Sequence, residues 1–129
     1  MGILLICEDD AVYHQTLRVL DGQANLIRKL FKDMKAYNDD MPYDILIVDF
    51  NQVKVDEKDY KTLLELKFKN NIPMLAILEK SSILDQFEVL SLGALDYLER
   101  PVDDAAYLTK RNHIYKWKWY YDRKKQKRD

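Results

Sequence analysis

Three short, mostly apolar runs of this chain are each followed directly by charged residues. They are residues 3–7, followed by Glu8, Asp9 and Asp10; residues 45–48, followed by Asp49; and residues 94–98, followed by Glu99, Arg100 and Pro101. A short continuous apolar run is typical of a strand that is covered on both faces. Because the carboxyl ends of parallel strands lie along one edge of a sheet, these charged side chains are expected to meet there. The sequence therefore predicts an acidic pocket with a cation beside it.

Length and composition favour a single domain with a basic end. A chain of 129 residues with 47% hydrophobic residues can bury one core but hardly two. The formal net charge is -1, yet residues 110–129 hold nine Lys or Arg residues against two Asp residues, so the rest of the chain is acidic. We expect one domain over residues 1–122 and a basic C-terminal tail over residues 123–129, which would suit the start of a linker.

The cysteine content and the N-terminal segment favour a cytoplasmic protein. The single cysteine, Cys7, lies within an apolar run, which suits a reducing compartment and excludes an internal disulfide. The apolar start has no basic region before it and breaks at Glu8, so neither a signal peptide nor a membrane span is expected. His14 and His113 have no companion at ligand spacing and are expected to be exposed helix residues.

Segments with helical periodicity separate the apolar runs. Asp10 is expected to cap a helix that ends before Gly22. The next segment is ambiguous, because residues 23–29 suit a strand that is followed by a helix over residues 30–38. Apolar residues at helical spacing also continue from Leu17 to Met34, which fits one long helix instead. Gly22 would cost that long helix about 1 kcal/mol.

The second half of the chain repeats this alternation. Residues 44–48, 74–78 and 94–98 are expected to be strands, and residues 60–68 and 83–92 are expected to be helices. Ser81 or Ser82 would cap the second of these helices, and Gly93 would end it. A terminal helix would begin at Asp103-Asp104. Its apolar residues would be Leu108, Ile114, Tyr115 and Trp119. Strands that alternate with helices indicate a parallel sheet with helices on both faces, joined by right-handed crossovers.

The segments "ILLICEDD", "DILIVDF" and "GALDYLERP", in this order and spacing, resemble the receiver domain of two-component response regulators. The likeness spans nearly the whole chain, and "GALDYLERP" is its most specific part. It implies an α/β fold with a doubly wound, five-stranded parallel sheet, a flavodoxin-like and receiver-like (βα)5 three-layer sandwich. The spacing of 40 residues from Asp9 to Asp49 is close to what the family needs for a helix, a strand and a helix, which favours a strand in the ambiguous segment.

The resemblance also implies a site at the edge of the sheet. Glu8 and Asp9 fall on the family's metal-binding pair, Asp49 falls on its phosphoacceptor, and Asn51 falls on the position whose backbone carbonyl also binds the metal. An aspartate can act as a nucleophile and hold a phosphoryl group as an acyl phosphate. Converging carboxylates repel one another, and a hard, oxygen-seeking ion such as Mg2+ would relieve that repulsion.

Three positions bear on whether this chain can switch as the family does. Leu78 stands where receivers keep a threonine or serine, so it has no hydroxyl to donate to a phosphoryl oxygen. Arg100 replaces the family lysine, which keeps the charge but exchanges a compact ammonium for a wide planar group. Tyr97 occupies the family's aromatic switch position, and Leu78 is expected to pack against it or to block its inward rotamer. Such packing would favour one fixed surface over two exchanging ones.

Two functions follow as alternatives. The first is a receiver-like signalling domain in a phosphorelay, in which Asp49 accepts a phosphoryl group from a histidine kinase or phosphotransfer protein with Mg2+ bound. The second is a divergent pseudo-receiver that acts by protein–protein interaction or dimerisation without phosphorylation. A homodimer would use the fourth helix, fifth strand and fifth helix of the family's fold. The chain has no glycine-rich nucleotide loop and no nucleophile triad, so a conventional enzyme is not expected.

The basic C-terminal end also contains aromatic residues. Residues 116–121 interleave cations with rings, a pattern that nucleic-acid-binding segments share. In a terminal helix, however, some of these rings are expected to cover the core, and a charged end is usually solvated. We therefore expect protein contacts here rather than nucleic-acid binding.

Overall fold

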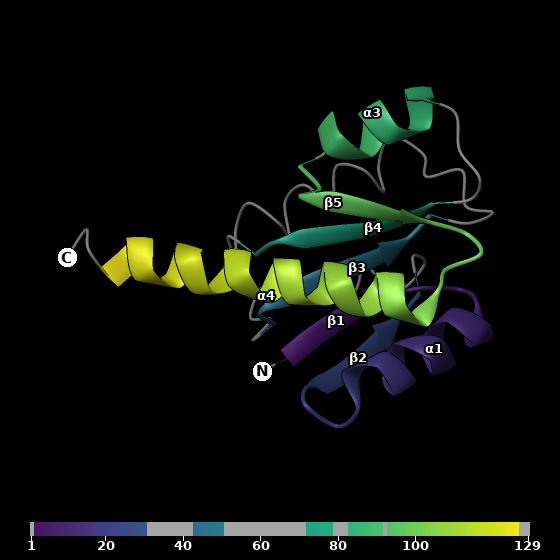
Figure 1. The fold of residues 1–129 in the computed structure, drawn as a ribbon, viewed down its shortest axis with the longest axis horizontal. Coiled ribbons are helices and arrows are strands. Elements are labelled where there is room, and N and C mark those ends of the chain that lie inside the picture. Colours follow the sequence, from purple (N-terminus) through teal and green to yellow (C-terminus); the bar gives the residue numbers. More distant parts are fainter. Residues whose placement is uncertain (1, 31–42, 51–71, 79–82, 92, 127–129) are drawn as a thin grey trace.

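The described part of the chain contains a five-stranded parallel sheet. A computed structural model describes residues 2–30, 43–50, 72–78, 83–91 and 93–126. The strands are β1 (Gly2–Ile6), β2 (Asn25–Lys29), β3 (Ile45–Asp49), β4 (Met74–Leu78) and β5 (Asp96–Glu99). Every neighbouring pair is parallel, and the order across the sheet is β2-β1-β3-β4-β5 (Figure 1). The doubly wound parallel sheet that the sequence predicts is confirmed.

Helices cover both faces of this sheet. The described helices are α1 (Asp10–Leu20), α3 (Ile83–Ser91) and α4 (Asp104–Gln126) (Figure 1). Apolar residues of α1 and α4 pack with one set of strand side chains, and Val89 of α3 packs with the other set. The two sets form separate apolar clusters on opposite faces, so the molecule has a helix layer, a sheet layer and a second helix layer.

Successive residues of the inner strands alternate between these two clusters. In β1, Ile3 and Leu5 face α1 and α4, whereas Leu4 and Ile6 face the side of α3, and none of the four is more than 2% exposed. Burial on both faces is the physical reason that the strands read as continuous apolar runs in the sequence. Each such side chain contributes about 1.5–3 kcal/mol of burial free energy relative to an exposed one.

The N-cap of helix α1 lies one residue earlier than the predicted cap. Its N-cap is Asp9, which has an extended backbone, and the Oδ1 atom of Asp9 accepts a hydrogen bond from the N–H of Ala11 at 2.8 Å. The predicted cap at Asp10 is wrong, because Asp10 is already the first helical residue and its side chain pairs with Arg28 at 2.6 Å. A capping side chain must come from the residue that precedes the helix.

The ambiguous segment forms a strand. Helix α1 stops at Leu20 because Asp21 and Gly22 follow it with φ angles of 48° and 71°, and two successive left-handed residues cannot continue a right-handed helix. The chain then pairs with β1 as β2, so the predicted strand is confirmed and the long-helix alternative is wrong. The helix expected over residues 30–38 lies almost wholly outside the described residues.

The second half of the chain matches its predicted order with small shifts in the strand limits. Strand β4 has the predicted limits, β3 includes Asp49 as its last residue, and β5 begins at Asp96, two residues later than expected. Gly93 has a φ of 98° and its N–H donates to the carbonyl of Leu90 at 3.0 Å, as expected of a glycine that ends a helix. The helix expected over residues 60–68 and the caps expected at Ser81 or Ser82 lie outside the described residues.

Among the described side chains of helix α4, those that are buried lie in its first half. Asp103 caps it by accepting a hydrogen bond from the N–H of Ala106 at 3.1 Å. Tyr107, Arg111 and Ile114 are then buried at helical spacing. The helix continues to Gln126 without a break at residue 122, and its C-terminal part projects beyond the sheet (Figure 1). The division into a domain over 1–122 and a tail over 123–129 stays a prediction.

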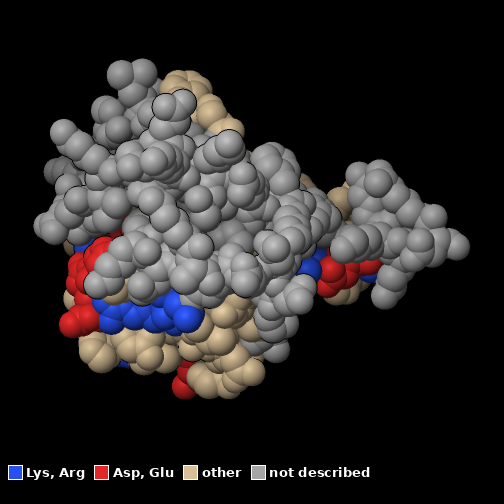
Figure 2. Space-filling view, turned by 180° about the vertical axis from the view of Figure 1, so that it is seen from behind, with Lys and Arg blue, Asp and Glu red and all other residues tan. Residues whose placement is uncertain are grey.

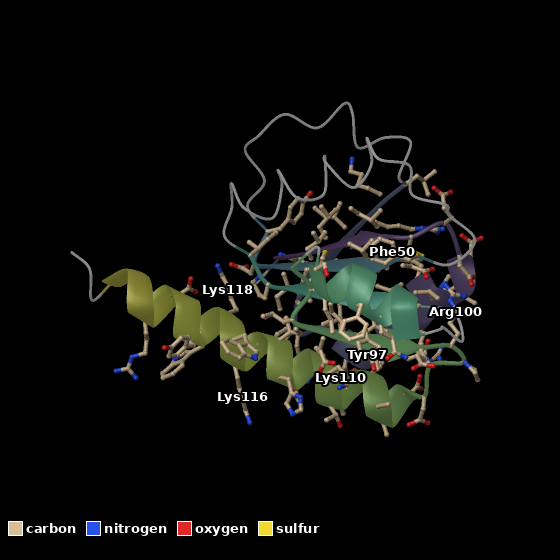
Figure 3. The ribbon with its side chains drawn as sticks, turned by 90° about the horizontal axis from the view of Figure 1, so that it is seen from above. Phe50, Tyr97, Arg100, Lys110, Lys116 and Lys118 are labelled. Atoms are coloured by element: carbon tan, nitrogen blue, oxygen red, sulfur yellow. The ribbon has the colours of Figure 1, made fainter. Side chains whose placement is uncertain are left out.

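Three aromatic residues of the C-terminal part of α4 are exposed. Trp117, Trp119 and Tyr120 are 45%, 59% and 49% exposed. The expectation that Trp119 is one of the core-facing residues of the helix is therefore wrong, because the sheet ends before the helix does, and the side chain of Tyr121 lies outside the described residues. Figure 3 shows Lys116 and Lys118 on this same part of α4. None of the helices in the described ranges is long and apolar enough to cross a membrane.

In the described part of the acidic body, basic side chains lie among the acidic ones. Figure 2 shows acidic and basic side chains next to one another on the side of the molecule opposite to the view of Figure 1. Several carboxylates of the body are paired with cations, including Arg18–Asp104, Arg28–Asp10 and Lys110–Asp96. Exposed pairs of this kind contribute little stability individually, so their main effect is on the local charge.

Candidate functional site

Three of the predicted site residues lie together at the carboxyl edge of the sheet. Asp49 ends β3, Asp9 lies between β1 and α1, and Arg100 directly follows β5. The backbone N–H of Arg100 donates to the carbonyl of Leu78 at 2.8 Å, which holds the start of the turn against β4. Figure 3 shows Arg100 at this end of the sheet, with acidic side chains around it. The parallel arrangement of the strands thus brings residues that are distant in sequence to one edge.

The guanidinium of Arg100 bridges the two carboxylates. Its Nη1 atom donates to Oδ2 of Asp9 at 2.6 Å, and its Nη2 atom donates to Oδ2 of Asp49. The side chain of Asp49 is only 1% exposed and that of Arg100 is 18% exposed, whereas Asp9 is 35% exposed. Asp49 is therefore a buried carboxylate, and its charge is balanced inside the protein by an arginine.

The pKa directions agree with this charge balance. Burial alone would lower the pKa of Arg100, but its hydrogen bonds with Asp9 and Asp49 outweigh that effect and raise the pKa. The hydrogen bond from Arg100, followed by that from the N–H of Ala11, lowers the pKa of Asp9 below its usual value of 3.8. The arginine is therefore charged and Asp9 is deprotonated throughout the neutral pH range.

Both oxygens of Asp9 and Oδ2 of Asp49 already accept hydrogen bonds, and a guanidinium joins the two side chains, so this arrangement does not fit a bound divalent ion. Asp9 uses Oδ1 for the helix cap and Oδ2 for Arg100. Within the described ranges, no three His, Cys, Asp or Glu side chains are grouped so that they could hold a metal ion. Glu8 is exposed, and Asn51 lies outside the described residues. The ligand set of Glu8, Asp9, Asp49 and Asn51 stays a prediction from the resemblance.

A groove opens beside the bridged pair. Its volume is about 770 Å³, and Asp9 and Arg100 line it together with residues of α1 and of the segment after β5. Gln15 spans the groove's two walls, since its amide donates to the carbonyl of Val102 at 2.6 Å and to Asp104 at 2.9 Å. Small ions and molecules can therefore reach the exposed side of Asp9 from solvent.

The two predicted switch positions belong to one apolar cluster. Leu78 is 4% exposed within that cluster, and the ring of Tyr97 packs against the same cluster. The hydroxyl of Tyr97 donates to Oε1 of Gln86 on α3 at 3.1 Å, and the amide of Gln86 donates to Glu99 at 3.1 Å. Figure 3 shows Tyr97 beside α3. These hydrogen bonds tie the tyrosine to α3 and, through Gln86, to the end of its own strand β5.

Two side-chain hydrogen bonds, one from Tyr97 to Gln86 and one between Thr16 and Tyr107, could not be predicted from the sequence. Gln86 is one of the polar residues of an amphipathic helix, and nothing in its position along the sequence indicates that it contacts Tyr97. Thr16 of α1 and Tyr107 of α4 are both fully buried, and their hydroxyls share a hydrogen bond of 2.7 Å. A pair of hydroxyls 91 residues apart has no local sequence signal, because only the packing of α1 against α4 brings them together.

Comparisons with known proteins give matches only at the level of structure. No protein-family model and no curated protein matches this sequence. A two-component response regulator from Clostridium difficile is 14% identical, with a TM-score of 0.74 over 90% of this chain and 96% of that one. A response regulator receiver domain protein from Clostridium thermocellum is 18% identical, with a TM-score of 0.72 over 92% and 97%. A protein of Burkholderia thailandensis described as a pilus assembly protein is 17% identical, with a TM-score of 0.73 over 90% and 98%.

The chain therefore has the receiver fold of response regulators, with the strand order and the helix layers that its sequence resemblance implies. The predicted flavodoxin-like, receiver-like architecture is confirmed. At these low identities the likeness concerns the fold alone. Since one fold can host many functions, the function has to be argued from the site.

Two substitutions of Asp9 should separate its role in the helix cap from its role in the ion pair. Asparagine is a good N-cap but carries no charge, so Asp9→Asn should remove the pair with Arg100 and keep the cap. Asp9→Ala removes both, and it should lower the free energy of unfolding by about 1 kcal/mol more than Asp9→Asn does. Urea denaturation at neutral pH measures this difference, and equal losses would contradict the capping role.

The Asp9→Asn substitution should also change how the stability of the fold depends on acid pH. Because the pKa of Asp9 is lowered in the folded state, its contribution to stability is complete above the ordinary value of 3.8 and is lost as the pH falls through the folded-state pKa. As the pH falls below 3.8, the free energy of unfolding of Asp9→Asn, measured by urea denaturation at a series of pH values, should therefore fall less steeply than that of wild type.

Proposed function

We propose that this chain is a signalling module of the receiver class that acts by binding a partner protein, without phosphorylation. The observation that carries the proposal is the arrangement of Leu78 and Tyr97. Leu78 places buried hydrocarbon where a phosphoryl group would need a hydroxyl donor, and Tyr97 is tied to Gln86 by its own hydroxyl. A module built in this way presents one fixed surface rather than alternating between two.

The environment of Asp49 supports the same proposal. A phosphoryl donor has to approach a nucleophilic carboxylate in line, and a side chain that is 1% exposed offers little access for that approach. Its hydrogen bond from Arg100 also stabilises the carboxylate and so lowers its tendency to attack. We propose no conventional enzymatic role for this chain.

The surface that we propose for the partner lies around β5. The helices α3 and α4 both contact this strand, and both expose apolar side chains. Phe87 and Leu90 of α3 are 63% and 42% exposed, and Leu108 of α4 is 40% exposed. Exposed apolar residues of this size are common at protein interfaces. A second copy of the chain, paired through α3, β5 and α4, is one partner that would cover them.

A second candidate function is supported by the convergence of Asp9, Asp49 and Arg100. In this alternative, Asp49 accepts a phosphoryl group from a histidine kinase or phosphotransfer protein, with Mg2+ as the cofactor. It requires Arg100 to release both carboxylates first, and Leu78 would still offer no hydroxyl. We therefore prefer the phosphorylation-independent module.

A phosphoryl mimic distinguishes the two candidates. In amide NMR spectra, beryllofluoride with Mg2+ should leave the resonances near Asp49 unchanged in the wild-type protein, because the site is closed by Arg100 and Leu78. Shifts centred on Asp49 that disappear in Asp49→Asn would overturn the proposal and support phosphoryl acceptance. The Asp49→Asn spectrum without beryllofluoride serves as the control for the fold.

A further inference from the structure

We propose that Arg100 is a built-in counter-ion that takes the place of a divalent metal, so that Asp9 and Asp49 bind no Mg2+ or Mn2+ while its guanidinium is present. The inference deepens the proposed function and rests on it, since a site closed by its own cation has no need of a metal. It concerns the same three residues but makes a separate claim about ion binding.

The first step is the geometry of the guanidinium. A planar fork can hold two separate carboxylates at once, one on each terminal nitrogen, and Arg100 does so with Asp9 and Asp49. A lysine ammonium is a compact point charge and does not present two divergent planar donors. The arginine therefore acts as a cross-link between the two carboxylates that a metal ion would otherwise join.

The second step is competition for the same oxygen atoms. Oδ2 of Asp9 accepts from Arg100, and Oδ1 of Asp9 accepts from the helix cap. Each donor occupies one lone pair of its oxygen, so a divalent ion at Asp9 would have to share these oxygens with the guanidinium and the helix cap. It would also lie a few ångströms from a guanidinium, and like charges at such a distance near a protein surface repel strongly.

The third step excludes lack of access as the barrier. The side chain of Asp9 is 35% exposed and lines a groove of about 770 Å³, so hydrated ions can reach it. At Asp9 the barrier to coordination is therefore the arginine and not the surrounding packing. Removal of the guanidinium should therefore create a divalent-ion site from the two carboxylates, since oxygen ligands of this kind suit Mg2+ and Mn2+.

Paramagnetic Mn2+ tests the inference directly, because it broadens amide resonances close to where it binds. The wild-type protein should show no selective broadening near Asp9 and Asp49. Arg100→Met removes the charge and keeps a long apolar stem, and it should bind Mn2+ at these residues at least about tenfold more tightly than wild type. Arg28→Met is the matched control, because Arg28 is another partly buried arginine that pairs with an aspartate at 2.6 Å, and it should behave as wild type does.

Further variants keep the inference testable where Arg100→Met folds poorly, which its amide spectrum would reveal. Arg100→Gln is a polar substitute that should gain the same selective broadening, and adding Asp49→Asn to either variant should abolish it. Selective broadening in wild type, or its absence in a folded Arg100 variant, would overturn the inference. Mn2+ binding by wild type without a response to beryllofluoride would defeat this inference alone, whereas a beryllofluoride response centred on Asp49 defeats the proposed function.

Discussion

An Arg100→Met protein should have a free energy of unfolding about 3–5 kcal/mol lower than that of wild type. The reason is that Asp49, at 1% exposure, loses the cation that balances its charge, so the folded state has to bear either an unpaired buried charge or the cost of protonating the carboxylate. Asp9 contributes less to the loss, because its carboxylate is 35% exposed and water can replace the arginine there. Urea denaturation followed by circular dichroism at neutral pH measures the change.

A double substitution provides the control for this result. Asp49→Asn in the Arg100→Met background removes the buried charge, so the double variant should regain most of the lost stability. Asp49→Asn alone should cost less than Arg100→Met, because Arg100 then still pairs with Asp9. If Arg100→Met unfolds at the same urea concentration as wild type, the bridge contributes nothing to the fold and the charge-balance argument fails.

Truncation of Tyr107 should destabilise the protein by a similar amount. Tyr107→Ala is expected to lower the free energy of unfolding by about 3–5 kcal/mol, because a fully buried aromatic ring would leave a cavity between α4 and the sheet. Tyr107→Phe keeps the ring and loses only the hydroxyl that bonds to Thr16, so its cost should be about 1–2 kcal/mol. Chemical denaturation of the three proteins measures both effects.

The exposed tyrosine of the same helix provides a matched comparison. Tyr120 is 49% exposed on the projecting part of α4, and Tyr120→Ala should change the free energy of unfolding by no more than about 0.5 kcal/mol. Equal losses for Tyr107→Ala and Tyr120→Ala would mean that the projecting part packs against something in the folded protein. That outcome would contradict the arrangement of α4 in Figure 1.

The strands were the most predictable part of the fold. A strand that is buried on both faces is apolar along nearly its whole length, so the continuous apolar runs in the sequence predict β1, β3 and β4. The cap of α1 was misplaced by one residue, because Asp9 and Asp10 are both good caps and only the backbone decides between them. The exposure of Trp117 and Trp119 was missed because periodicity cannot show where the sheet beneath a helix ends.

The amino-acid sequence by itself determined which residues reach the edge of the sheet. Charged residues that follow apolar strands must lie at the strand ends, and parallel pairing puts those ends side by side, which is why the positions of Asp9, Asp49 and Arg100 along the chain suffice to group them. Only the tertiary structure decided that one guanidinium joins both carboxylates and that Tyr97 bonds to Gln86. The physical reason is that hydrogen-bond partners depend on distances of a few ångströms between side chains on separate elements, and the packing of the whole molecule sets those distances.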